Sequence, residues 1–171
     1  YCEYLQEKNY DDGLSLVKKF PNLIITRSFS KIYALGGLRI GWGYSSMQNI
    51  LKLYQYKKPF NVSRLSCVAA TEALKDQRWI SRSVKNNQNN KKYTTNNLNN
   101  SLIKTIDTTA NFILLEFSHE KIANKFVKFL YTNKITVRHL ASYGLPKYVR
   151  MTIGSLAEMK KTIKICNRFD V

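Results

Sequence analysis

The chain has 171 residues, of which 44% are apolar and 12% aromatic. This is enough apolar material for the core of one domain or of two small ones, which excludes a wholly disordered chain. Lys and Arg number 28 against 11 Asp and Glu, so the formal net charge is +17, and nucleic acid has to be considered as a partner.

The basic residues are spread along the chain, and many of them adjoin asparagines. This pattern favours a solvated surface, with a basic nucleic-acid-binding module as the alternative of another class. No apolar run approaches the ~20 residues that cross a bilayer, so we expect no membrane partner. The three cysteines are irregularly spaced, which indicates neither a disulfide framework nor a metal site and suits a reducing, cytoplasmic setting.

The first half of the chain predicts alternating helices and strands. Residues 4–22 predict a helix and then a turn, and the β-branched run at 23–26 predicts a buried strand. Residues 38–44 alternate between apolar and other residues, which predicts a second strand. Helices are expected over 47–56 and from a cap at Ser63 through about residue 74.

The second half predicts a separate small unit. Residues 78–101 are strongly polar, and we expect a long exposed helix that bridges two domains, with a disordered linker as the alternative. A strand at 111–117, a helix at 121–131, alternating segments at 135–140 and 149–153, and a final helix then follow. Ser155-x-x-Glu158 is a capping-box pattern at the start of that helix. This order predicts a small α+β domain.

One stretch carries chemistry, and it runs from Ser28 to Trp42 with the sequence SFSKIYALGGLRIGW. Lys31 follows a predicted strand and two hydroxyl residues, Ser28 and Ser30. Arg39 lies beyond a Gly-Gly pair that allows close backbone approach. The hydroxyls can donate to phosphate oxygens, and the guanidinium can form a bidentate pair with the same group. Lys31 would then lie within reach of an electrophilic carbonyl, with which it could form a Schiff base.

This stretch resembles the lysine signature of fold-type I pyridoxal-phosphate aminotransferases, S-x-S-K-x-x-x-L-x-G-L-R-x-G. The rest of the chain is similar to the histidinol-phosphate aminotransferases, within the class II aminotransferases. The segments that carry this similarity are Tyr1–Tyr4, Pro21–Ile24, Pro59–Ser63, Ala110–Leu114, Val137-Arg138, Tyr143–Pro146 and Val149–Gly154. The resemblance implies an α/β chain, the C-terminal half of such an enzyme. Residues 1–77 would end the large cofactor-binding domain, and residues 78–171 would form a bridging helix and the small domain.

The resemblance also implies a role for each residue of the motif, with pyridoxal 5'-phosphate as the cofactor. Lys31 would be the catalytic residue, which attaches the cofactor and then moves a proton between the substrate α-carbon and the cofactor. Ser28 and Arg39 would hold the cofactor phosphate, with Ser30 assisting. Tyr1 would hydrogen-bond the cofactor's phenolic oxygen.

Three further residues are expected to bind the substrates, which are a small amino donor and a 2-oxo acid. Arg150 would bind a substrate carboxylate, and Arg138 would contact the distal acid or phosphate group. Asn61 is a weaker candidate for the same pocket. No metal site is expected, and the two isolated histidines are assigned no role.

The implied reaction is amino transfer between histidinol phosphate and 2-oxoglutarate, in a cytoplasmic homodimer. An aromatic aminotransferase or a threonine-phosphate decarboxylase is the alternative within the family. An inactive relative is disfavoured because Lys31 and Arg39 are both present. The family's aspartate for the pyridine nitrogen would precede residue 1, so we expect the chain alone to be inactive. We also expect apolar surface to be uncovered beside Leu23–Ile25.

Overall fold

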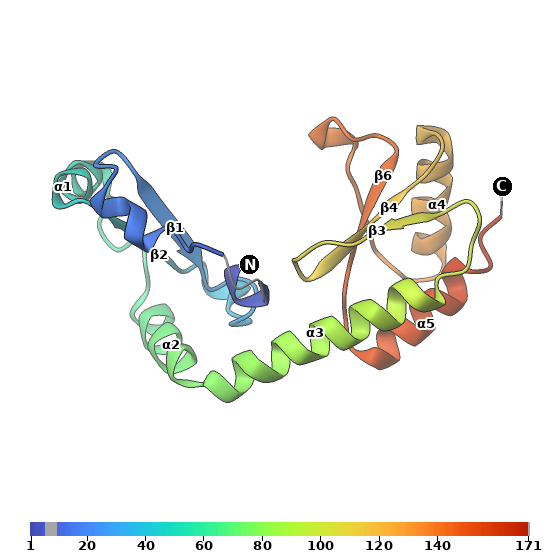
Figure 1. Ribbon diagram of the computed structural model, residues 1–171, viewed down its shortest axis with the longest axis horizontal. Helices are drawn as coiled ribbons and strands as arrows, with labels where there is room; N and C mark the ends of the chain where they lie inside the picture. Colours follow the sequence, from blue (N-terminus) through green and yellow to red (C-terminus); the bar gives the residue numbers. More distant parts are fainter. Residues whose placement is uncertain (6–9, 171) are drawn as a thin grey trace. The chain divides into compact units, whose positions relative to one another are not determined.

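The computed structural model describes residues 1–5 and 10–170, which contain both helices and sheets and confirm the predicted α/β class. Two compact units make up the chain, Tyr1–Ser83 and Val84–Val171, here called unit 1 and unit 2. The predicted division at 77/78 falls where the long helix α3 (Gln77–Asn97) begins (Figure 1). Among the described residues, none of the helices combines the length and the apolar character needed to cross a bilayer.

Unit 1 is built on a two-stranded antiparallel sheet of β1 (Ile24–Ser28) and β2 (Gly41–Ser45). The register places Ser28 opposite Gly41. Short 3-10 helices precede β1, η1 (Cys2–Tyr4) and η2 (Leu14–Lys18).

The helix predicted over 4–22 is therefore wrong for the described part of that range. The carboxylates of Asp11 and Asp12 accept bonds from the Gly13 and Leu14 N–H groups at 2.7 and 3.0 Å. Gly13 has a φ of 82°, which places it in the left-handed region. These local bonds compete with a helix and turn the chain. Residues 6–9 of the prediction lie outside the described residues.

The second strand begins later than predicted, at Gly41 rather than residue 38. Residues 36–38 instead form the 3-10 helix η3 (Gly36–Leu38), and Arg39 follows with a left-handed φ of 51°. Residues 38 and 39, which the alternating pattern predicted as strand, therefore belong to the turn that precedes β2.

The two helices α1 (Met47–Tyr56) and α2 (Arg64–Lys75) confirm the predicted positions. Ser63 caps α2 as expected, because its hydroxyl accepts a bond from the Ser66 N–H at 3.0 Å. Apolar side chains on both helices are exposed, including Leu51, Tyr54 and Leu65. The expected uncovered apolar surface is present, but it extends mainly over these helices, and of Leu23–Ile25 only Ile24 is exposed.

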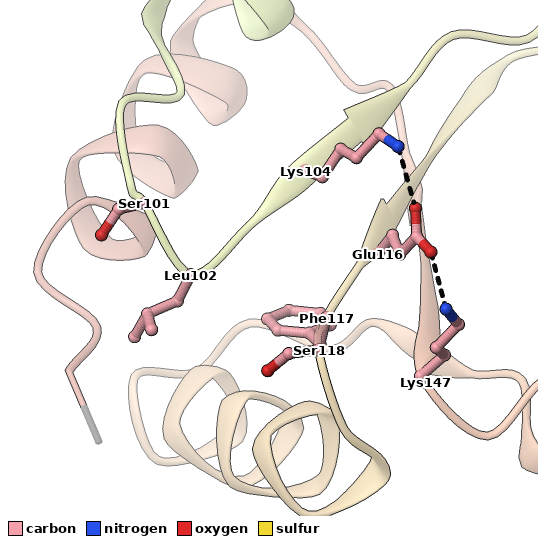
Figure 2. Close-up of a pocket in the computed structure, with 7 residues that line it drawn as sticks. All are labelled: Ser101, Leu102, Lys104, Glu116, Phe117, Ser118 and Lys147. Carbon is pink, nitrogen blue, oxygen red and sulfur yellow. Dashed lines mark ion pairs between the residues drawn. The ribbon is translucent and has the colours of Figure 1, made fainter.

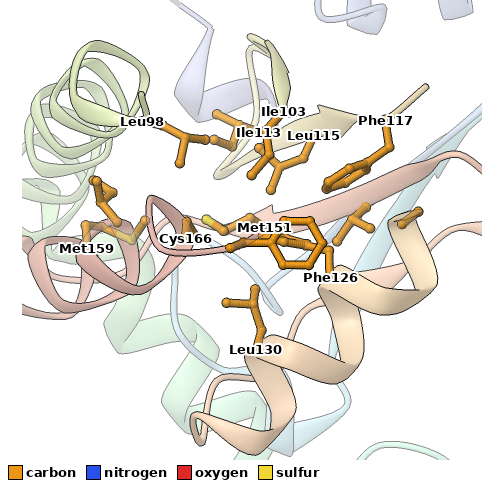
Figure 3. Packing of buried hydrophobic residues seen from close by; sticks show 14 residues of the cluster. Leu98, Ile103, Ile113, Leu115, Phe117, Phe126, Leu130, Met151, Met159 and Cys166 are labelled. Carbon is orange, nitrogen blue, oxygen red and sulfur yellow. The ribbon is translucent and has the colours of Figure 1, made fainter. Parts of the chain in front are cut away.

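Unit 2 contains a four-stranded antiparallel sheet in the order β3-β4-β6-β5. Its strands are β3 (Lys104–Ile106), β4 (Phe112–Glu116), β5 (Arg138–His139) and β6 (Tyr148–Thr152). The helices α4 (Glu120–Thr132) and α5 (Leu156–Cys166) supply the rest of the core. Figure 3 shows side chains of both helices meeting those of the sheet. The capping box of α5 is present, as predicted from Ser155 and Glu158.

Two strands of this sheet differ from expectation. The strand β3 was not predicted, and the alternating segment 135–140 is a strand only at 138–139. Lys134 has a left-handed φ of 63°, and the N–H of Ile135 bonds back to Leu130 at the end of α4. The chain is thus still completing the helix turn where the pattern predicted a strand.

Polar side chains attach α3 to the rest of unit 2. Asn87 donates to the carbonyl of Ala110 at 3.2 Å, Asn90 donates to that of Gly154 at 2.9 Å, and the Lys91 ammonium donates to that of Thr108. The predicted helix is therefore confirmed, and the disordered-linker alternative is wrong.

Candidate functional site

The predicted signature folds into a closed loop, residues 28–39, here called the lysine loop. Its ends meet because the N–H of Phe29 donates to Ile40 at 3.2 Å and the N–H of Leu35 donates to Phe29 at 3.1 Å. A tight turn inside the loop is closed by the bond from the N–H of Ala34 to Lys31 at 2.9 Å. Backbone hydrogen bonds therefore hold the loop together between β1 and β2.

Two buried side chains fix the part of the loop that carries the lysine. Phe29 and Ile32 are 4% and 3% exposed and flank Ser30 and Lys31, whereas Lys31 itself is exposed. The ring of Phe29 also lies 4.9 Å from that of Tyr33. Because its neighbours are anchored in the core of unit 1, the backbone of Lys31 is held in place while its side chain is exposed.

The predicted phosphate ligands lie close together in the lysine loop. The Ser28 hydroxyl donates to that of Ser30 at 2.8 Å and accepts the Ser30 N–H at 3.0 Å. Gly36 lies against Ser30, and a Cβ at Gly36 would be only 3.2 Å from the Ser30 carbonyl oxygen. The Arg39 guanidinium donates to the Gly36 carbonyl at 2.7 Å. The structure therefore brings two hydroxyls and a guanidinium to one short segment.

The ring of Tyr1, a residue expected to bind the cofactor, lies beside the lysine. The Lys31 ammonium nitrogen lies 5.8 Å from the centroid of the Tyr1 ring, within cation–π range. Nearby, Tyr33 donates to a Glu3 carboxylate oxygen at 3.4 Å. Burial, and then the Glu3 charge, raise the pKa of the Tyr33 hydroxyl. Tyr33 therefore remains a protonated donor, and Glu3 is a neighbour that the sequence motif did not indicate.

This set of groups fits the predicted cofactor. Hydroxyl and guanidinium donors suit a phosphate monoester, and a primary amine suits an aldehyde. Gly36 allows the backbone to lie close to Ser30, because the Cβ of any larger residue would crowd the Ser30 carbonyl oxygen. Asn61 lies in the exposed segment between α1 and α2, and no side-chain hydrogen bond within residues 1–5 and 10–170 links it to the lysine loop.

In unit 2, the two predicted arginines lie directly opposite each other. Arg138 of β5 pairs with Arg150 of β6 in the antiparallel register. Both line one pocket of about 470 Å³, here called the arginine pocket. Its other lining residues are Val127, Thr136, Val137, His139 and Thr152. Like charges in directly opposed positions are unfavourable in a sheet, so this arrangement calls for a negative partner.

Each guanidinium has only partial compensation from the protein. Arg138 donates to the Tyr143 hydroxyl at 3.1 Å, and Arg150 lies 5.2 Å from the Phe112 ring centroid. The Nε of Arg150 is buried without a hydrogen-bond partner. Within the described ranges, no carboxylate forms an ion pair with either arginine. The pocket therefore suits an anionic ligand.

A second pocket in unit 2, of about 310 Å³, contains cations that already have a partner. Lys104 and Lys147 both pair with Glu116, at 3.5 and 2.9 Å (Figure 2). The Tyr148 hydroxyl donates to the same carboxylate at 3.0 Å. The bond from Lys147 lowers the pKa of Glu116, and the carboxylate in turn raises the pKa of Lys147. Because one carboxylate serves both ammonium groups, this pocket is a weaker anion site than the arginine pocket.

No group of three or more metal-ligating side chains occurs in the part of the chain that the structure describes. Of the predicted site residues, Ser28, Ser30, Lys31 and Arg39 lie in the lysine loop of unit 1, and Arg138 and Arg150 line the arginine pocket of unit 2.

Comparison with known proteins places these features in a family. A family model described as aminotransferase class I and II matches residues 3–165. The histidinol-phosphate aminotransferase of Paracoccus denitrificans is 34% identical over 169 residues, which cover 99% of this chain and 46% of that protein. The Granulibacter bethesdensis protein of the same name is 38% identical over 158 residues, which cover 92% and 43%.

A solved structure shows the same fold. The histidinol-phosphate aminotransferase of Sinorhizobium meliloti, in complex with pyridoxal-5'-phosphate, superposes with a TM-score of 0.86 at 24% identity. The match covers 98% of this chain and 46% of that one. The chain spans about half the length of the curated relatives that it matches.

Proposed function

This chain belongs to the class I and II aminotransferase family, and from that premise we propose that it supplies the lysine loop and the arginine pocket of a pyridoxal-phosphate-dependent aminotransferase. The observation that carries the proposal is the lysine loop, where Lys31 is exposed beside the Tyr1 ring, and the same short segment holds the paired Ser28 and Ser30 hydroxyls and the Arg39 guanidinium. When bound, pyridoxal phosphate supplies an aldehyde and an electron-withdrawing ring.

The residues of unit 1 have distinct tasks in this proposal. Ser28, Ser30 and Arg39 bind the phosphate, because two hydroxyls and a guanidinium together offer enough donors for its oxygens. Tyr1 donates to the phenolic oxygen of the ring. Lys31 would hold the cofactor through its aldehyde, and its amine would act as the general base that takes the proton from the substrate α-carbon.

The proposed substrates are histidinol phosphate as amino donor and 2-oxoglutarate as acceptor. The names of the relatives support the donor, and the arginine pocket supports acidic substrates in general. Arg150 binds a carboxylate, and Arg138 binds the distal acid or phosphate. We further propose that the enzyme works as a cytoplasmic homodimer and that these 171 residues alone do not transaminate.

The cofactor assignment is tested by reductive labelling of the 171-residue chain. The chain is mixed with substoichiometric pyridoxal phosphate, reduced with borohydride and mapped by peptide mass spectrometry. We expect the pyridoxyl group mainly on Lys31. Lys57 is a matched control within the chain, because its ammonium nitrogen lies 5.3 Å from the Tyr54 ring centroid without the hydroxyls and guanidinium of the loop.

Variants separate a phosphate site from a merely reactive amine. Arg39→Gln and Ser28→Ala are expected to lower labelling of Lys31 and to leave that of Lys57 unchanged. Labelling spread evenly over the lysines of the wild-type chain would refute the cofactor assignment.

The substrate assignment is tested by amino-transfer assays. The isolated chain is expected to show no turnover, and turnover would contradict the proposal that it needs the rest of the enzyme. In the complete enzyme, histidinol phosphate should be preferred over aromatic amino acids. A preference for an aromatic donor, or carbon dioxide release from threonine phosphate, would replace the proposed substrate with the corresponding alternative.

A further inference from the structure

Two side chains from the helices that follow it hold the lysine loop. Trp79, in the first turn of α3, donates from its indole Nε1 to the carbonyl oxygen of Ile32 at 2.7 Å. Ser66, in the first turn of α2, donates from its hydroxyl to the carbonyl oxygen of Leu38 at 2.9 Å. Ile32 follows Lys31 and Leu38 precedes Arg39. Each bond thus fixes the peptide beside one predicted site residue.

The indole of Trp79 is itself held in place. The backbone N–H of Trp79 donates to the Asp76 carboxylate at 2.9 Å, which fixes the start of α3. The guanidinium carbon of Arg82 lies 5.3 Å from the centroid of the indole ring. An indole has a single N–H donor, and here that donor is used on the loop. The partner residue, Ile32, has a buried side chain, so the carbonyl and the side chain of one residue are both anchored.

Ser66 acts on the other end of the loop. Its side chain is buried, and its hydroxyl lies 2.8 Å from that of Ser63, the cap of α2. The residue after Leu38 is Arg39, whose φ of 51° is unfavourable for a residue with a Cβ. A hydrogen bond to the Leu38 carbonyl therefore fixes the peptide that leads into this conformation.

We propose that Trp79 and Ser66 are positioning residues, which act through the Ile32 and Leu38 carbonyls to hold Lys31 and Arg39 in the arrangement that binds the cofactor. The inference rests on the proposed function of the lysine loop. Pre-organised groups bind a ligand more tightly because less conformational freedom is lost on binding.

The test for Trp79 compares two identical substitutions in the labelling experiment. Trp79→Phe keeps an aromatic ring and removes the N–H, and Trp42→Phe makes the same change on β2, where the tryptophan side chain donates no hydrogen bond to the loop. Loss of one neutral hydrogen bond predicts a roughly two- to tenfold fall in the Lys31:Lys57 labelling ratio for Trp79→Phe. Trp42→Phe should match the wild type.

A spectroscopic measurement separates positioning from stability. After reduction, a pyridoxyl group on Lys31 should show induced circular dichroism, and this signal per label should fall in Trp79→Phe while the far-UV spectrum and the melting temperature stay at wild-type values. A fall in labelling that comes with loss of the fold would overturn the positioning role.

The test for Ser66 uses rescue by a conservative variant. Ser66→Ala should lower the labelling ratio, and Ser66→Thr, which retains the hydroxyl, should restore it. Wild-type labelling ratios in both Trp79→Phe and Ser66→Ala would refute the inference. Failure of the proposed function is distinguishable, because it would already be seen as even labelling in the wild-type chain.

Discussion

A close approach of the two strands in unit 1 gives a sharp prediction about Gly41. A Cβ at this position would lie 2.5 Å from the Arg27 carbonyl oxygen, a backbone atom that cannot rotate away. At Gly43, two residues further along the same strand, the corresponding distance to the Ile25 carbonyl oxygen is 3.7 Å, an ordinary contact. The two glycines therefore make a matched pair for substitution.

We expect Gly41→Ala to lower the free energy of unfolding of unit 1 by about 1–3 kcal/mol, the usual cost of an overpacked site whose backbone must shift by a fraction of an ångström to ~1 Å. The shift would also displace Ser28, which is paired with Gly41. Gly43→Ala should be neutral or stabilising by up to about 1 kcal/mol, because alanine restricts the unfolded chain more than glycine does.

Urea unfolding followed by tryptophan emission measures this difference. Both tryptophans of the chain, Trp42 and Trp79, lie in unit 1, so the emission reports mainly on unit 1. The reasoning would be refuted if Gly41→Ala and Gly43→Ala had equal midpoints.

Three further predictions concern the rest of the chain. Burial raises the pKa of the Cys166 thiol to about 12. Iodoacetamide at mildly alkaline pH should therefore alkylate the exposed Cys67 and should react with Cys166 only after denaturation. Peptide mapping would show which cysteine is alkylated. Phe126 is fully buried, so Phe126→Ala should lower the free energy of unfolding by about 3–5 kcal/mol. Phe60→Ala, at a side chain that is 99% exposed, should leave it nearly unchanged. Urea unfolding followed by far-UV circular dichroism measures both. The pKa of Glu116 is lowered in the folded chain, so its contribution to stability is present above the usual carboxyl pKa of 4.5 and is lost as the pH falls through the lower folded value. Glu116→Gln should remove this part of the acid dependence of the melting temperature, and an unchanged pH profile would contradict it.

The features that could be predicted from the sequence depend on local signals. The helices α1, α2 and α5 begin at residues whose side chains cap them, and caps are visible as short patterns. The strands β4 and β6 alternate between buried and less buried residues in step with the sequence. The structural matches also confirm the predicted fold-type I architecture.

The features that could not be predicted depend on contacts between distant residues. The three-residue strand β3 exists because it pairs with β4, and its own sequence is too short to carry a period. The bonds from Ser66 and Trp79 to the lysine loop join residues 28 and 47 positions apart. A polar residue at the start of a helix has many possible partners, and only the fold selects one.

In the candidate site, too, local signals could be predicted and contacts between distant residues could not. The motif itself predicted Lys31, Ser28 and Arg39 as neighbours, because they are close in the chain. Roles for Arg138 and Arg150 could be predicted only separately, from the two segments that contain them. Their direct opposition, however, follows from the register between β5 and β6, and a slip of one residue would place them on opposite faces of the sheet.

The attachment of α3 has a consequence for the behaviour of the protein in the cold. Two of its three buried residues, Asn87 and Thr94, are polar, and side-chain bonds to backbone carbonyls join the helix to unit 2. Exposure of polar surface lowers the heat capacity, whereas exposure of apolar surface raises it. Detachment of α3 should therefore carry a small heat-capacity increment. Near freezing, the attachment of α3 to unit 2 should therefore weaken less than the packing of the buried phenylalanine side chains in the core of unit 2.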